Sequence, residues 1–171
     1  WESISRSIFL FDTSALGSNA DISAAVMSIF GIAKSNDFPS TDPDLDIYTS
    51  APASDTGLAA GDYDSLGSTS QTGAPVSFAN YIVDAVNYTD FTFNATGRGN
   101  ISKTGISKFG AKNASYDNAA VAPTWGAFKT MSFTGYFSDQ AGTANDPKLV
   151  VTYTVTVVPG KAMSNLLLMG V

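Results

Sequence analysis

The chain has 171 residues, a formal net charge of −6, no cysteine and no histidine. The missing cysteine excludes disulfides, thiolate zinc sites and cysteine nucleophiles, and the missing histidine removes the commonest general base and the usual partner of a nucleophilic serine. The nine lysines and arginines are scattered and make no basic patch, so nucleic acid is not an expected partner.

A chain of this length can bury about 70% of the surface that its unfolded form exposes, which is enough for one core. We therefore expect a single domain. No apolar run reaches the roughly 18 residues of a transmembrane helix, so no membrane insertion is expected. Only 14% of the residues are charged, and serine, threonine, asparagine and glycine are abundant. This composition is typical of secreted, surface-displayed or virion β-proteins, and we expect an extracellular, cell-surface or virion location.

Short apolar or alternating segments, bounded by Gly, Pro, Asn and Asp, recur along the chain and predict an all-β sandwich. In chain order, the predicted strands are 5–11, 24–32, 45–49, 76–82, 89–94, 106–112, 131–137 and 148–158. About eight antiparallel strands are typical of a jelly roll. Two short helical turns are expected at 55–63 and 96–104, where each would close one end of the sandwich.

The pattern inside three of these strands carries further predictions. Phe91 and Phe93 fall on one face of their strand and polar residues on the other, as in a half-buried strand. The alternation in 131–137 breaks at Gly135, which predicts a bulge or bend. The run 148–158 is mostly β-branched and aromatic, so we expect it to close the domain and to pair or pack with the opening strand.

Pro159 and Gly160 end this last strand, so a β-jelly-roll module at 1–158 is followed by a C-terminal tail at 159–171. The tail is too apolar for a free terminus. It is interpreted as an additional strand, an interface segment or the start of a following domain. Its candidate assembly residues are Leu166, Leu167, Leu168 and Met169.

Two segments near the N-terminus, RSIFLFDTSAL at 6–16 and ADISAAVMSIF at 20–30, and the closing PKLVVTY at 147–153 resemble DNRLRE (disaggregatase-related) modules. Those modules open with an arginine-led strand and an FD-S-L turn. The chain is also similar to β-modules of phage structural proteins and of bacterial or archaeal surface proteins. The resemblance implies a jelly-roll accessory module of a larger extracellular or virion protein, sometimes polysaccharide-binding, without catalysis. It supplies no ligand residue.

Trp125 is the main candidate for ligand binding, because proteins that bind sugars stack aromatic rings on the apolar sugar faces. It lies in the loop-like segment APTWGA at 122–127, with Tyr116 and Asp117 close in sequence. A buried Trp125 would instead cap the core, which is the commoner situation for a large aromatic side chain. Both interpretations stay open.

Aspartates cluster at 42–46, 55–64 and 139–146. No cofactor is required, but a structural calcium ion is one interpretation, because calcium binds about six to eight oxygen ligands. The D-x-D-x-D spacing lacks the glycine and the distal glutamate of an EF-hand, and the capping of turns by aspartate is the commoner explanation. Glu2 is the only glutamate and no aspartate pair stands out, so a glycosidase is not expected.

These observations predict a non-catalytic structural or adhesive module. It would assemble with copies of itself or with a larger scaffold protein through strand edges and the tail. The alternative is a carbohydrate-binding module that recognises polysaccharide through loop aromatics, with Trp125, Tyr116 and Asp117 as its ligand-binding residues.

Overall fold

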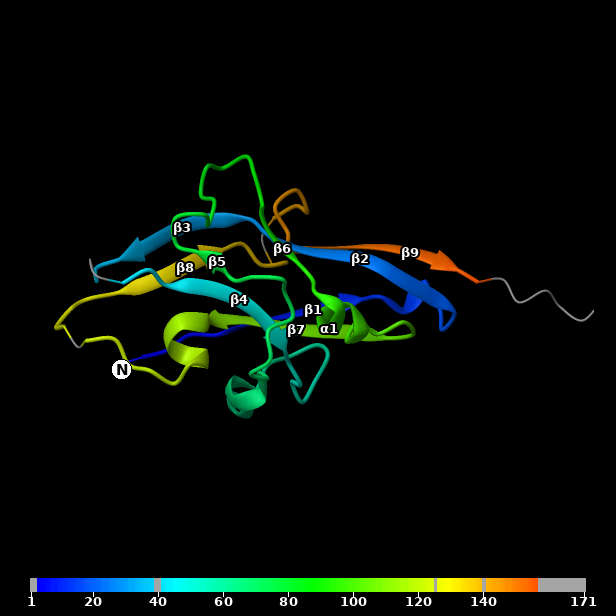
Figure 1. The fold of residues 1–171 in the computed structure, drawn as a ribbon, viewed down its shortest axis with the longest axis horizontal. Coiled ribbons are helices and arrows are strands. Elements are labelled where there is room, and N and C mark those ends of the chain that lie inside the picture. Colours follow the sequence, from blue (N-terminus) through cyan, green and yellow to red (C-terminus); the bar gives the residue numbers. More distant parts are fainter. Residues whose placement is uncertain (1–2, 39–40, 125, 140, 157–171) are drawn as a thin grey trace, which may run out of the picture.

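The computed structural model describes residues 3–38, 41–124, 126–139 and 141–156. Nine strands are found in these residues, all in antiparallel pairs, together with four short helical segments (Figure 1). The strands are β1 (Ser7–Asp12), β2 (Ala20–Ile29), β3 (Gly31–Asn36), β4 (Asp44–Thr49), β5 (Val76–Ser77), β6 (Thr89–Thr92), β7 (Ile106–Asn113), β8 (Met131–Gly135) and β9 (Lys148–Val155). The all-β prediction is confirmed, whereas the jelly-roll connectivity stays a prediction.

The four helical segments are short and lie between strands. They are the 3-10 turns η1 (Ser14–Leu16) and η2 (Ala60–Ser65), the α-helix α1 (Ala95–Gly99) and the π-helical turn η3 (Ala114–Asn118). The segments η2 and α1 overlap the two predicted helical turns. The turn η3 was not predicted, and it carries the candidate residues Tyr116 and Asp117.

The strands form three sheets. Their orders are β1-β7-β4-β5, β6-β2-β9 and β3-β8. The chain of β2 runs through Phe30 into β3, so the last two sheets share one continuous backbone, and the carbonyl of Phe30 accepts a hydrogen bond of 3.0 Å from the amide of Tyr136. In Figure 1, β2 and β9 run above β1 and β7, and the core lies between these layers.

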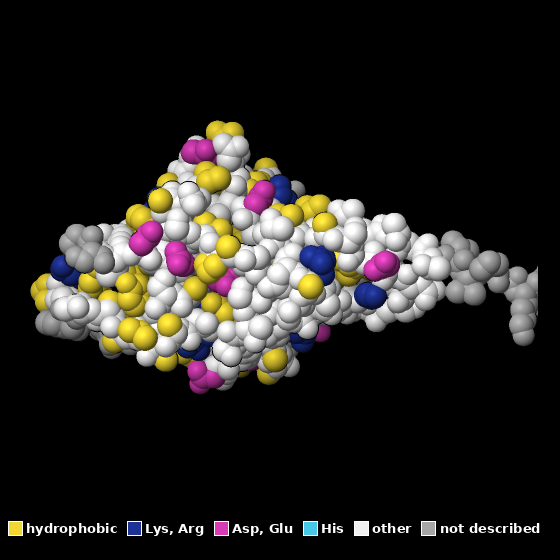
Figure 2. Space-filling view, viewed as in Figure 1, with side chains coloured by type: hydrophobic (Ala, Val, Ile, Leu, Met, Phe, Trp, Pro, Cys, Tyr) yellow, Lys and Arg dark blue, Asp and Glu magenta, His cyan; other side chains and the backbone are white. Residues whose placement is uncertain are grey.

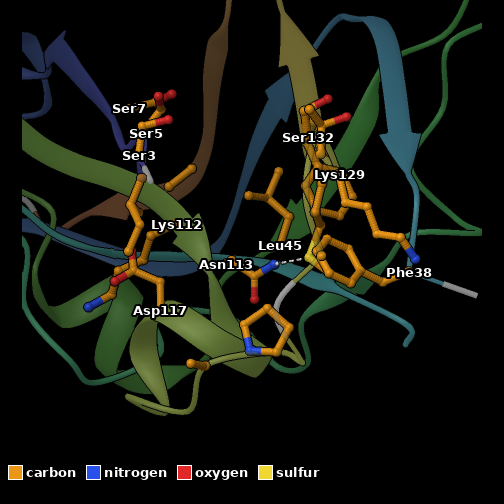
Figure 3. Close-up of a pocket in the computed structure, with 18 of the residues that line it drawn as sticks. Ser3, Ser5, Ser7, Phe38, Leu45, Lys112, Asn113, Asp117, Lys129 and Ser132 are labelled. Atoms are coloured by element: carbon orange, nitrogen blue, oxygen red, sulfur yellow. Dashed lines mark hydrogen bonds between the residues drawn. The ribbon is translucent and has the colours of Figure 1, made fainter. Parts of the chain in front are cut away.

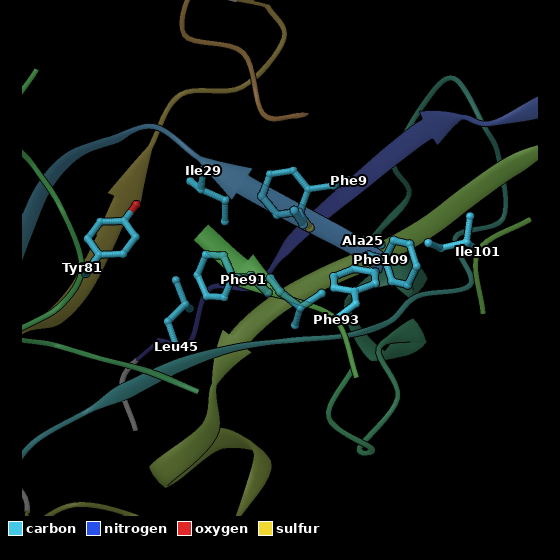
Figure 4. Packing of buried hydrophobic residues seen from close by; sticks show 12 residues of the cluster. Phe9, Ala25, Ile29, Leu45, Tyr81, Phe91, Phe93, Ile101 and Phe109 are labelled. Atoms are coloured by element: carbon cyan, nitrogen blue, oxygen red, sulfur yellow. The ribbon is translucent and has the colours of Figure 1, made fainter. Parts of the chain in front are cut away.

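The core is built from alternating inward-facing residues of both layers, as strand geometry requires. Phe91 and Phe93 are both buried and their neighbours Asp90 and Thr92 are exposed, which confirms the predicted alternation. The Phe93 and Phe109 rings pack edge to face across the layers, with centroids 4.8 Å apart (Figure 4). The buried cluster comprises Phe9, Ala25, Met27, Ile29, Leu45, Ile47, Tyr81, Phe91, Phe93, Ile101, Phe109 and Ala111.

The first and last strands do not pair with each other. The strand β1 pairs with β7, and β9 pairs with β2 in another sheet. They meet only in the common core, where Phe9 is a buried member and Leu149 and Val151 pack against the cluster. The expectation that these strands pair or pack together is therefore met by packing into one core, without pairing.

Two predicted strands differ most in extent from the observed ones. The predicted strand 24–32 begins earlier, at Ala20, and is split at Phe30 into β2 and β3, whereas the predicted strands 5–11, 89–94, 131–137 and 148–158 differ from β1, β6, β8 and β9 by two or three residues at one end. Of the predicted strand 76–82, only β5 is observed. The amides of Asn80 and Tyr81 donate hydrogen bonds to the carbonyl of Ser77, so the chain forms a turn there.

The predicted irregularity near Gly135 is present, but the additional residue lies on the partner strand. Gly31 is opposite Gly135 and Ala33 is opposite Thr134, so Ile32 is the extra residue in β3. A methyl group at Gly135 would contact the side chain of Ile29 at 2.6 Å. The glycine thus permits the close approach of β8 to the end of β2.

Candidate functional site

A pocket of about 730 Å³ lies where the start of β1, the end of β7, residues 122–123 and 126–130, and β8 come together. One wall carries Ser3, Ser5, Ser7, Lys112 and Asp117, and the opposite wall carries Phe38, Lys129 and Ser132 (Figure 3). Leu45, Ala111, Met131 and Phe133 add apolar surface. The volume is within the range of roughly 300–1,000 Å³ that is usual for pockets that bind small molecules.

Asp117 is held in place by Arg6, which lies 111 positions away in the sequence. The guanidinium donates two hydrogen bonds to this carboxylate, Nε to Oδ2 at 2.8 Å and Nη2 to Oδ1 at 2.7 Å. It donates a third, at 2.9 Å, to the carbonyl of Tyr63 and stacks 4.1 Å above the Tyr63 ring. The hydrogen bonds with Asp117 raise the pKa of Arg6. Both oxygens of Asp117 are therefore committed to a structural ion pair.

Lys112 lies beside this pair on the outer face of the four-stranded sheet. In the register it is opposite Asp46 of β4, and its side chain is 7% exposed. Its Nζ lies 4.7 Å from the centroid of the Tyr48 ring, and no described residue makes a hydrogen bond or an ion pair with it. Burial lowers the pKa of Lys112, and the neighbouring Asp117 opposes this effect.

Two residues in the segment between η3 and β8 have unusual backbone geometry, and one of them, Phe128, lines the pocket. Ala120 and Phe128 adopt positive φ angles of 54° and 59°, which are rare for residues other than glycine. The Phe128 side chain is fully exposed. At the end of this segment, Thr130 donates from its amide and its hydroxyl to Asp37, both at 2.9 Å, and these bonds lower the pKa of Asp37.

The ligand-binding and assembly residues predicted from the sequence fall into three groups. Asp117 lines the pocket, and Tyr116 precedes it in η3 with a half-buried side chain. Trp125 lies outside the described residues, but Pro123 and Gly126, close to it in the chain, both line the pocket. The four tail residues Leu166, Leu167, Leu168 and Met169 also lie outside the described residues.

Sequence reasoning missed the rest of the pocket, because its described residues come from five separate stretches of the chain. The one local indication of the pocket was Lys112 in the predicted strand 106–112. The alternation of this strand places Lys112 on the face opposite to that of the core residues Phe109 and Ala111. The other elements could not be brought together without the topology.

Several aspartates accept hydrogen bonds from backbone amides. The Asp62 carboxylate accepts hydrogen bonds from the amides of Ala53 and Ala59, at 2.8 and 2.7 Å. Buried Asp46 accepts from the Thr72 hydroxyl. Within the described part of the chain no three acidic side chains gather as metal ligands. The calcium site stays a prediction.

The open edge of β9 is a second candidate site. This strand is the outer member of its sheet and shows no pairing on its far side with any described residue. Its side chains Val150 and Val155 are more than half exposed, at 55% and 53%, and Tyr153 is also exposed. On the face shown in Figure 2, charged side chains are scattered and form no patch of one sign.

No protein-family model, no curated protein and no solved structure matches this chain. The relationship to DNRLRE modules therefore stays a prediction from the sequence. Among the described residues, no helix has the length and apolar character needed to span a membrane.

Proposed function

We propose that this chain is a non-catalytic structural or adhesive module of a virion, surface fibre or secreted protein. It joins copies of itself through the open edge of β9, with the tail 159–171 adding to the contact. The same edge would bind a larger scaffold protein of which the module is a part. A DNRLRE-like relationship and an extracellular or virion location belong to this proposal.

The observation that carries the proposal is the contrast between the two edges of the three-stranded sheet. The β6 edge is covered, because the amide of Gly73 donates to the carbonyl of Thr92 at 3.0 Å and Thr72 forms a bridge with Phe93. The β9 edge has no such cover among the described residues. Long, apolar edge strands promote pairing between chains, and monomeric proteins usually blunt them with charges, prolines or bulges.

The shape of β9 supports edge-to-edge pairing further. It has eight residues, and its one charged side chain, Lys148, stands at its start with Nζ 3.8 Å above the Tyr88 ring. No proline or charge interrupts 149–155. A second copy pairing along this edge would satisfy its backbone groups and cover Val150 and Val155.

The test is sedimentation of the full chain across a concentration series. We expect the wild-type chain to associate. Val150→Lys places a charge in the centre of β9 and should weaken association at least about tenfold, because charges on edge strands oppose pairing. Val86→Lys is the matched control, since Val86 is also exposed but lies in the loop before β6 and not in β9. Removal of 161–171 should weaken association as well. A wild-type chain that stays monomeric at all concentrations would overturn the proposal.

The second candidate function is recognition of carbohydrate at the 730 Å³ pocket. It is favoured by one observation, namely that residues on both sides of Trp125 in the sequence line this pocket. Trp125→Ala should then abolish retention on immobilised polysaccharides without changing the thermal unfolding temperature. Retention that is unaffected by this substitution would count against the loop aromatic as a binding residue.

A further inference from the structure

We infer that the 730 Å³ pocket takes an acidic sugar chain, whose carboxylates are held between Lys112 on one wall and Lys129 on the other. This inference rests on carbohydrate binding at the pocket, the second candidate function above. It is independent of assembly through β9. The inference specifies that the ligand is negatively charged and that Lys112 and Lys129 select it.

The first step is the charge of the lining. Among the described residues that line the pocket, two are lysines and one is an aspartate, Asp117, whose two oxygens accept hydrogen bonds from Arg6 at 2.7 and 2.8 Å. The chain as a whole carries −6. Positive charge thus gathers at the pocket in a protein that is otherwise acidic, which favours an anionic ligand over a neutral or cationic one.

The second step is the state of Lys112. Its side chain is 7% exposed, and its Nζ makes no hydrogen bond or ion pair with any described residue. The described groups around it are the Tyr48 ring at 4.7 Å, the nearby carboxylate of Asp117 and the cation of Arg6. Asp46, whose Oδ1 accepts from the Thr72 hydroxyl, lies opposite it in the register. An ammonium group in such surroundings pays a desolvation cost that a ring face offsets only in part. A ligand carboxylate would supply the missing partner.

The third step is the opposite wall. Lys129 is exposed, with its Nζ 5.5 Å from the centroid of the Phe38 ring and Asp37 nearby. The Asp37 carboxylate accepts both hydrogen bonds from Thr130 at Oδ2 and remains charged, so it offsets part of the Lys129 charge. Lys129 and Phe38 together offer a cation beside an aromatic ring. This combination suits a sugar that has both a carboxylate and an apolar face.

The remaining lining fits the other groups of a sugar. The serines at 3, 5, 7 and 132 provide hydroxyls that can donate and accept, and Asn113 provides an amide. Phe133 and Met131 provide apolar surface. Because the lysines stand on opposite walls (Figure 3), an oligomer with carboxylates on successive rings can meet both, whereas a single carboxylate can meet only one.

The experiment measures retention of the full chain on four immobilised acidic polymers, namely polygalacturonate, alginate, hyaluronan and polysialic acid. Each is compared with its carboxyl-reduced form, which keeps the sugar backbone and loses the charge. We expect at least one polymer to bind about tenfold more tightly than its reduced form, with affinity falling as salt rises. Inorganic phosphate at the same ionic strength should compete no better than chloride.

The variants assign the effect to the pocket. Lys129→Gln should weaken binding to the acidic polymer about fivefold, and because Lys129 is exposed the variant should fold normally. Lys112→Gln should weaken it further. Lys103→Gln, which changes a lysine outside the pocket by the same substitution, should bind as the wild-type chain does.

Three results would overturn the inference. Equal binding to a polymer and to its reduced form would show a pocket indifferent to charge, leaving carbohydrate binding intact. Competition by phosphate would show a general anion site. The absence of binding to every polymer would remove both this inference and the second candidate function, and would leave the assembly proposal untouched.

Discussion

Gly97 illustrates how a single residue sets the contact between α1 and its neighbours. The helix begins after Asn94, whose Oδ1 accepts from the amide of Gly97 at 2.8 Å and whose Nδ2 donates to the carbonyl of Thr72 at 2.6 Å. The first bond caps α1, and the second connects the start of the helix to Thr72. A methyl group on Gly97 would overlap the carbonyl oxygen of Gln71, so only glycine fits this contact without a shift of the backbone.

We predict that Gly97→Ala lowers the free energy of unfolding by about 2 kcal/mol, because the backbone must move to relieve the overlap. Gly99→Ala is the matched control in the same helix, since its methyl group would meet nothing within 4 Å. There the substitution should be neutral or stabilising by up to about 1 kcal/mol. Urea denaturation of both variants measures the difference. Equal stabilities would show that α1 is not held against Gln71.

At the residue scale, the sequence predicted the faces of side chains well where the pattern is local. The burial of Phe91 and Phe93 followed from strict alternation. The pairing of Arg6 with Asp117 could not be predicted, because 111 positions separate the partners and neither residue stands in a motif. Trp125 was noted for its chemistry alone, and its burial stays untested.

At the scale of elements, Tyr81 connects the turn after β5 to β8. Its hydroxyl donates to the carbonyl of Thr134 at 3.0 Å, its ring packs edge to face on Phe133, and burial raises its pKa to about 12. An unfolded tyrosine titrates near pH 10. Between about pH 10 and 12 the unfolded chain loses the phenolic proton and the folded chain keeps it, so stability falls as pH rises in this window.

We predict that Tyr81→Phe costs about 1 kcal/mol at pH 8, where the hydrogen bond to Thr134 is lost. The advantage of the wild-type chain should shrink between pH 10 and 12, because the phenylalanine variant has no proton to lose at this position. Chemical denaturation of both chains from pH 8 to 12 measures this. A difference that stays constant over the range would contradict the assigned pKa.

The ion pair of Arg6 and Asp117 connects the start of β1 to η3 and shapes one wall of the pocket. The Asp117 side chain is only 4% exposed, so removal of its partner leaves a buried charge. Arg6→Gln should therefore cost about 3 kcal/mol, and Arg6→Gln combined with Asp117→Asn should cost clearly less than the sum of the two single changes. A double-mutant cycle measures the coupling. Additive effects would show that the pair contributes no specific stabilisation.

The elements themselves were largely predictable, and their ends were less so. Strands with β-branched or alternating residues, such as β4 and β7, were found within one residue of the expected bounds. The split at Phe30 was missed because Phe30 and Gly31 continue the apolar pattern of β2 while the backbone changes direction. The turn η3 was missed because a single π-helical turn has no periodicity that a pattern could reveal.

At the scale of the whole molecule, no local sequence pattern indicates which strands form the edges of a sheet. The run 148–155 is apolar enough for a central strand, yet β9 is the outer member of its sheet. Sheet order depends on contacts between distant segments, such as β2 with β9, which local patterns do not encode. This mismatch between an apolar strand and an edge position is the basis of the assembly proposal.

The β9 edge is tested most directly by amide hydrogen exchange of the full chain at low and high protein concentration. If copies pair along β9, exchange in 148–155 should slow by at least about tenfold at high concentration, because the outward amides gain partners. Exchange in β6, whose outer edge is already covered, should not change. The account would be contradicted if sedimentation shows that the chain associates at high concentration while the exchange rates in β9 stay the same at all concentrations.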